Sequence, residues 1–165
     1  MSHLEFSNNG VVDSLTHSPA PAIFLENVKR EHSNALREMR PISILSIQAR
    51  DSANVTSAQL IEMARLITKH MRSGEFYSRI SESGFWISVR GSEAAAITLS
   101  QRIMGQRIMG QGLMSQGILS GRETNTNTES ESQYRYWRTS VIECAPSQDL
   151  NSWIKSVDLA HFQSS

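Results

Sequence analysis

The feature that most constrains the fold is a pair of short strand-like segments separated by a tight turn. Residues 75–80 and 85–89 contain the aromatic and β-branched side chains that favour β-strands. Residues 81–84 lie between them and read Ser-Glu-Ser-Gly, a composition typical of a turn. The pattern therefore predicts a β-hairpin in the middle of the chain.

Further elements are expected on both sides of this hairpin. Apolar residues recur at helical spacing in four segments, which are residues 23–39, 57–72, 92–104 and 150–163. Short apolar segments predict two more strands, over residues 42–47 and 137–144. After the first helix, the first six elements follow the split βαβ order of ferredoxin-like folds. We therefore expect an α/β (α+β) domain with a central antiparallel sheet flanked by helices, of which the second and third cover one face.

Two segments differ in composition from this domain, which we place at residues 22–165. Residues 1–21 are polar and end in Ser-Pro-Ala-Pro, which predicts a flexible N-terminal tail. Residues 102–121 repeat Arg-Ile-Met-Gly-Gln with decay, and a five-residue step rotates side chains by about 140° on a helix, so no face stays apolar. We expect residues 105–133 to form an irregular insert. It is either an expanded surface loop or a Met-rich surface for a partner.

Composition limits the classes of function. A chain of 165 residues with 39% hydrophobic content is expected to form one domain with its own core. Lys and Arg total 16 and equal Asp and Glu at 16, so no overall field attracts nucleic acid. No apolar run approaches the roughly 20 residues of a membrane span, and the first 28 residues lack the Lys or Arg of a secretory signal. With Cys144 as its single cysteine, the chain is expected to be cytoplasmic.

The hairpin resembles that of the GGDEF family, the bacterial diguanylate cyclases that join two GTP molecules into cyclic di-GMP. The family's five-residue signature corresponds here to Ser81-Glu82-Ser83-Gly84-Phe85. Arg79-Ile80 stands where the family has Arg-Tyr, and Trp86-Ile87-Ser88-Val89 corresponds to the short hydrophobic strand that follows the signature. The resemblance extends over residues 23–163 and implies the ferredoxin-like palm of nucleotidyl cyclases, acting in bacterial signal transduction.

The resemblance also implies that catalysis has been lost. Family members need two carboxylates that hold Mg²⁺ against the triphosphate of GTP. The corresponding positions carry Gln48 and Gly84, an amide and no side chain. The glycines that approach the phosphates are replaced by Ser81 and Glu82, and the guanine-reading loop is shortened to about residues 50–56. We expect a degenerate domain with no catalytic residue, no metal site and no cofactor.

A second family site, which binds cyclic di-GMP as an inhibitor, is better retained. It combines an Arg-x-x-Asp motif ahead of the signature with an arginine on the next helix. This chain has Arg72-x-x-Glu75 and Arg102 at these positions. Guanidinium groups make paired hydrogen bonds to phosphate, and a carboxylate accepts hydrogen bonds from guanine. The resemblance thus implies a cyclic di-GMP receptor or effector.

An alternative stays open. Arg72 and Glu75 are also compatible with an ordinary surface pair worth under about 1 kcal/mol. The chain is then a nucleotide-independent protein–protein interaction or adaptor module with a protein partner. A homodimer is compatible with both hypotheses.

Overall fold

The structure is a computed structural model that describes residues 6–105 and 136–162. The expected insert at 105–133 lies almost entirely outside the described residues. Along the chain the elements are α1 (Pro21–Glu38), β1 (Ser43–Ala49), α2 (Ser57–His70), β2 (Phe76–Ser81), β3 (Gly84–Val89), α3 (Glu93–Met104), β4 (Trp137–Glu143) and α5 (Leu150–Phe162). They match the segments that the sequence predicts to within about two residues at most ends.

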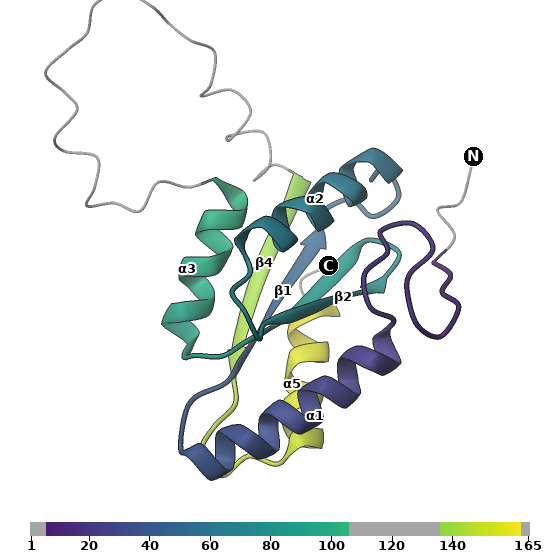
Figure 1. The fold of residues 1–165 in the computed structure, drawn as a ribbon. Coiled ribbons are helices and arrows are strands. Elements are labelled where there is room, and N and C mark those ends of the chain that lie inside the picture. Colours follow the sequence, from purple (N-terminus) through teal and green to yellow (C-terminus); the bar gives the residue numbers. More distant parts are fainter. Residues whose placement is uncertain (1–5, 106–135, 163–165) are drawn as a thin grey trace, which may run out of the picture.

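The strands form one antiparallel sheet in the order β2-β3-β1-β4 (Figure 1). The expected hairpin is β2–β3, in which Ser81 pairs with Gly84 across the turn. The pairing shifts between Arg79 and Ser81, so the hairpin is irregular just before its turn. β1 lies between β3 and β4, which confirms the central antiparallel sheet and the α+β fold class.

Helices cover both faces of the sheet (Figure 1). Side chains alternate between the two faces along a strand. Leu45 and Ile47 of β1 therefore pack with α2 and α3, whereas Ile44 packs on the other face with α1 and α5. The expectation that residues 57–72 and 92–104 cover one face is confirmed. No helix in the described part of the chain is both long and apolar enough to cross a membrane.

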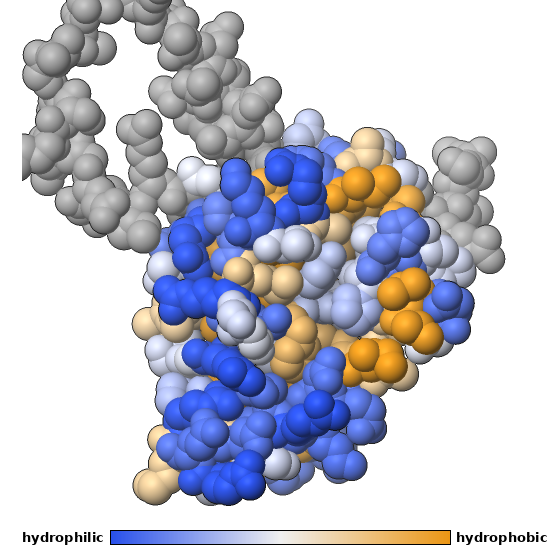
Figure 2. Space-filling model, viewed as in Figure 1, coloured by the Kyte–Doolittle hydropathy of each residue, from blue (hydrophilic) through white to orange (hydrophobic). Residues whose placement is uncertain are grey.

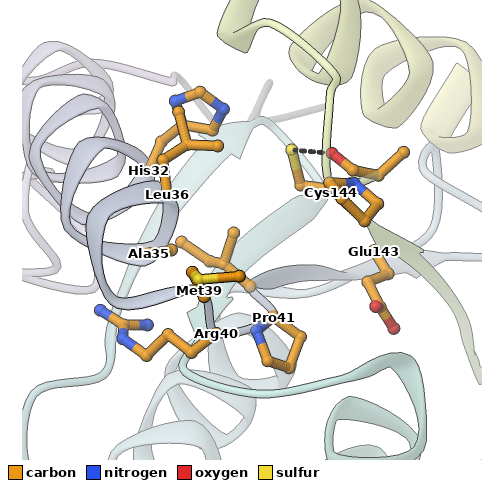
Figure 3. Close-up of a pocket in the computed structure, with 11 residues that line it drawn as sticks. His32, Ala35, Leu36, Met39, Arg40, Pro41, Glu143 and Cys144 are labelled. Carbon is orange, nitrogen blue, oxygen red and sulfur yellow. Dashed lines mark hydrogen bonds between the residues drawn. The ribbon is translucent and has the colours of Figure 1, made fainter.

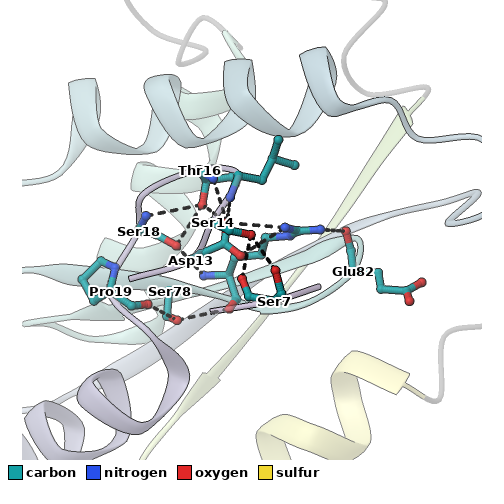
Figure 4. A network of polar contacts seen from close by, with 10 residues as sticks. Ser7, Asp13, Ser14, Thr16, Ser18, Pro19, Ser78 and Glu82 are labelled. Carbon is teal, nitrogen blue, oxygen red and sulfur yellow. Dashed lines mark hydrogen bonds and ion pairs between the residues drawn. The ribbon is translucent and has the colours of Figure 1, made fainter. Parts of the chain in front are cut away.

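Residues 6–20 pack against the outer strand β2, which differs from the expected flexible tail over residues 1–21. The Ser78 hydroxyl donates a hydrogen bond of 2.6 Å to the Pro19 carbonyl, and the Arg79 backbone N–H donates to Ser18 Oγ at 3.1 Å (Figure 4). The Asp13 carboxylate accepts from the Thr16 N–H and hydroxyl and pairs with Arg79. Polar composition suggested solvation, but these polar groups bond to the strand edge and to one another.

The surface of this region is partly hydrophobic. Val11 and Ile23 are 62% and 41% exposed. Figure 2 shows hydrophobic surface over the segment before α1 and over the beginning of that helix, whereas the rest of α1 is mostly hydrophilic.

Candidate functional site

The residues between α2 and β2 form a closed turn that presents Arg72. α2 ends at His70, two residues earlier than expected, and Met71 is already extended. The Glu75 N–H donates to the Arg72 carbonyl at 3.1 Å, and Glu75 Oε2 accepts the Arg72 backbone N–H at 2.8 Å. Gly74 has a φ of +84°, which glycine adopts without strain. Glu75 therefore stabilises the turn through these two hydrogen bonds, while Arg72 is exposed.

Arg102 lies near the C-terminal end of α3 and close to the end of α2. The pKa of His70 is lowered by burial, by Lys69 and by the positive charge of Arg102, which places this charge near the last residue of α2. Arg102 is half-buried, and its Nε is buried without a hydrogen-bond partner among the described residues. No hydrogen bond or ion pair joins Arg102 to Arg72 or Glu75 within the described residues. The structure thus brings Arg102 to the same end of α2 without direct contact.

A further arginine, which the sequence did not single out, lies against this turn. A Cβ added to Gly74 would be only 2.6 Å from Arg90 Nη1. Glu31 of α1 holds Arg90 through two hydrogen bonds of 2.9 and 2.6 Å and also binds Arg40 at 2.9 Å. Burial acts to raise the pKa of Glu31, but the bonds to Arg90 and Arg40 outweigh it and lower the pKa. Glu31 and Arg90 are 59 positions apart, so no local signal could reveal this pair.

The two positions at which the resemblance places catalytic carboxylates do meet in the structure. Gln48 on β1 pairs directly with Gly84 on β3. Gln48 Nε2 donates a hydrogen bond of 2.8 Å to the Ser83 hydroxyl, inside the signature turn. Glu82 is exposed, and its carbonyl accepts from Arg79 Nη2 at 2.8 Å. The adjacency of Gln48 and Gly84 agrees with the resemblance. The groups present there are the Gln48 amide, the Ser83 hydroxyl and a glycine without a side chain.

His161 of α5 is a residue of this region that the sequence did not single out. Its Nδ1 is hydrogen bonded to the Ser46 hydroxyl, and its ring lies beside Gly84. Burial, together with the positive charge of Arg138, lowers the pKa of His161 to about 4. The imidazole is therefore neutral at physiological pH. Ser46 and His161 are 115 positions apart, which explains why spacing gave no signal.

These side chains do not fit the metal that the fold family implies. Mg²⁺ binds oxygen ligands and strongly prefers carboxylates. Ser46, Gln48, Ser83 and His161 supply hydroxyl, amide and imidazole groups, and Gly84 supplies none. Within residues 6–105 and 136–162, no group of three or more His, Cys, Asp or Glu side chains is arranged to hold a metal.

A hollow of about 610 Å³ lies away from both sites, between the end of α1 and the segment after β4 (Figure 3). Leu36 and Met39 line one side and Cys144 lies on the other. Burial, with the nearby charges of Asp149 and Glu143, raises the pKa of the Cys144 thiol. The thiol is therefore protonated and a poor nucleophile.

Comparison with known proteins identifies the fold. No family model matches the sequence, and no curated protein matches it. Among solved structures, the chain is similar to the GGDEF domain of DgcB from Caulobacter crescentus in complex with cyclic di-GMP, with a TM-score of 0.67, 16% identity, and coverage of 97% of this chain and 92% of that one.

Two further solved structures have the same fold. A diguanylate cyclase protein from Thermotoga maritima has a TM-score of 0.60 and 18% identity, covering 88% of this chain and 97% of that one. The diguanylate cyclase SiaD from Pseudomonas aeruginosa, in complex with its activator SiaC, has a TM-score of 0.67 and 14% identity, covering 93% of this chain and 57% of that one. The chain therefore folds as a GGDEF-like domain.

Proposed function

We propose that this chain is a catalytically inactive GGDEF-like signalling domain that binds cyclic di-GMP through Arg72, Glu75 and Arg102. The observation that carries the proposal is the closed Arg72–Glu75 turn, which leaves the Arg72 guanidinium exposed next to the end of α2. Glu75 Oε1 accepts no hydrogen bond from the described residues, so it is available to accept from a guanine.

The three side chains suit a cyclic dinucleotide. Arginine forms paired hydrogen bonds to phosphate and stacks on planar bases. Arg102 adds a second guanidinium whose buried Nε lacks a partner among the described residues. An unpaired buried donor is costly, and a ligand acceptor would relieve that cost. The complex of DgcB with cyclic di-GMP supports the choice of ligand at the level of the fold.

Inactivity is the second part of the proposal. A cyclase reaction needs carboxylates for Mg²⁺ at the end of β1 and in the turn, where this chain has Gln48 and Gly84. A cytoplasmic location belongs to the same proposal, since a single cysteine, Cys144, is compatible with a reducing compartment.

Calorimetric titration of the purified chain with cyclic di-GMP tests the proposal. We expect heat of binding with micromolar or tighter affinity. No heat and no NMR chemical-shift change at high ligand concentration would refute the receptor function.

A protein-interaction module is the second candidate, and one observation favours it. Leu36 and Met39 are 50% and 93% exposed beside the 610 Å³ hollow, and flexible methionine adapts to irregular contacts. The binding of SiaD to its activator SiaC shows a protein partner for another protein of this fold. A co-purifying protein together with a negative cyclic di-GMP titration would favour this function.

A further inference from the structure

The polar side chains at the end of β1, which are Ser46, Gln48, Ser83 and His161, fill space as well as lacking carboxylates. Gln48 and His161 both lie against Gly84, where the cyclase reaction would require a carboxylate. We infer that His161 of α5, with Gln48, closes the metal site, so that restoring the carboxylates alone does not restore metal binding. This inference rests on the inactive state in the proposed function.

The first argument is space. A Cβ added to Gly84 would overlap Gln48 Oε1 and would lie 2.6 and 2.7 Å from Cε1 and Nε2 of His161. Real Cβ atoms essentially never approach other heavy atoms this closely. The Gln48 amide is the end of a flexible side chain and is able to swing away. A glutamate at position 84 therefore meets its main obstacle in the His161 ring.

The second argument is that this ring is held in place. His161 is 2% exposed, and Ser46 fixes its Nδ1 through a hydrogen bond. The ring packs edge-on against Trp86, with centroids 6.1 Å apart, and against Phe162 at 4.7 Å. Moving the ring thus breaks a buried hydrogen bond and two aromatic contacts.

The third argument is the size of the space that remains. A hollow of about 20 Å³ adjoins Ser46, Gln48, Arg138 and His161. Mg²⁺ keeps several waters beside its phosphate ligands, so a hollow this small next to Gln48 and His161 does not hold a hydrated ion. The Arg138 side chain also places a positive charge next to this hollow.

A double-mutant cycle tests whether His161 occupies the space at position 84. We expect Gly84→Ala to lower the Tm of the wild-type chain, and to lower it by less than half as much in a His161→Ala background. Gly91→Ala is the matched control, because its Cβ would meet Ala95 at 2.8 Å and not His161. Its effect should be the same in both backgrounds, since separated sites add. An equal loss for Gly84→Ala in both backgrounds would overturn the inference.

A second measurement uses Mn²⁺ alone as the probe. We expect Gln48→Asp/Gly84→Glu to bind Mn²⁺ no better than wild type by electron paramagnetic resonance. Adding His161→Ala should tighten binding at least tenfold. Adding His32→Ala instead is the control, because this other buried histidine packs on Trp153. The inference would be overturned if Gln48→Asp/Gly84→Glu bound Mn²⁺ with the same affinity with and without His161→Ala. The same holds if neither variant bound Mn²⁺. These two experiments contain no nucleotide, so their outcome does not depend on whether the chain binds cyclic di-GMP. Failure of the receptor function and failure of this inference can therefore be told apart.

Discussion

Asp13 and Arg79 lie 66 positions apart and form an ion pair of 3.1 Å in which both side chains are fully buried. The pair joins the segment before α1 to the strand that enters the signature turn. Arg79 also donates to the Glu82 carbonyl at 2.8 Å, so the same guanidinium fixes the turn itself (Figure 4). The segment before α1 is therefore part of the hairpin's support.

Removing Asp13 should destabilise the fold strongly. Asp13→Ala leaves Arg79 buried without its partner, and breaking one side of a buried pair costs about 3–5 kcal/mol. Urea unfolding followed by circular dichroism measures this loss. Glu62→Ala is the control, because its pair with Arg65 is exposed and is worth at most about 1 kcal/mol. A loss for Asp13→Ala no larger than the control would contradict the structural role of the pair.

The free energy of unfolding should decrease as the pH is lowered from 6.5 to 4, because of His161. Its folded-state pKa is lowered to about 4 from 6.5, so over this window the unfolded chain binds a proton that the folded chain does not. The contribution is fully present above pH 6.5, shrinks as the pH falls, and is lost below about 4. A shift of this size corresponds to roughly 3 kcal/mol.

Urea unfolding of wild type and His161→Asn at pH 7 and pH 4.5 measures this dependence. Asn cannot titrate, so the variant should lose less stability on acidification than wild type. Carboxylates such as Glu31 titrate in both proteins and cancel in the comparison. Equal pH dependence of the two proteins would show that His161 is not the group responsible.

Cyclic di-GMP affinity should depend on the two arginines. Arg72→Ala should weaken binding at least tenfold, about 1.4 kcal/mol, and Arg102→Ala should weaken it as well. Glu75→Asp, which restores the family residue, should preserve or tighten binding if the shorter side chain still reaches the Arg72 N–H. Calorimetric titration measures all three variants. Arg65→Ala provides the control, because this arginine is exposed on α2 and paired with Glu62.

The Arg65→Ala control also shows which result would contradict this prediction. If Arg65→Ala weakens binding as much as Arg72→Ala does, the effect is one of general charge and the Arg72–Glu75 turn is not the site.

The purified chain should make no cyclic di-GMP from GTP with Mg²⁺ or Mn²⁺. The reason is that Gln48 and Gly84 stand where metal-binding carboxylates are needed. Chromatographic product analysis after long incubation measures this. Turnover that disappears in Glu82→Ala would show that the signature turn retains a catalytic carboxylate, in contradiction to the proposed inactivity.

The sequence predicted the elements well because the signals are local. A short apolar, β-branched segment marks β1, which is almost entirely buried as expected. Helical spacing marks α2 through Leu60, Met63, Ala64 and Ile67, which are also buried. The turn between β2 and β3 follows from its own residues. Even here, the predicted end of α2 was wrong by two residues, because the Arg72 N–H donates to the Glu75 side chain instead of to a helix carbonyl.

By itself, the sequence determined the order of strands and helices along the chain and the hairpin, while a ligand site at Arg72, Glu75 and Arg102 stays a prediction. The tertiary structure alone decided which distant side chains meet: Asp13 with Arg79, Glu31 with Arg90, and Ser46 with His161. The physical reason is that periodicity reflects contacts within a few residues along the chain. A buried charge or imidazole, in contrast, is stabilised by partners that only the packing of α1, α5 and the first segment onto the sheet brings within hydrogen-bond distance.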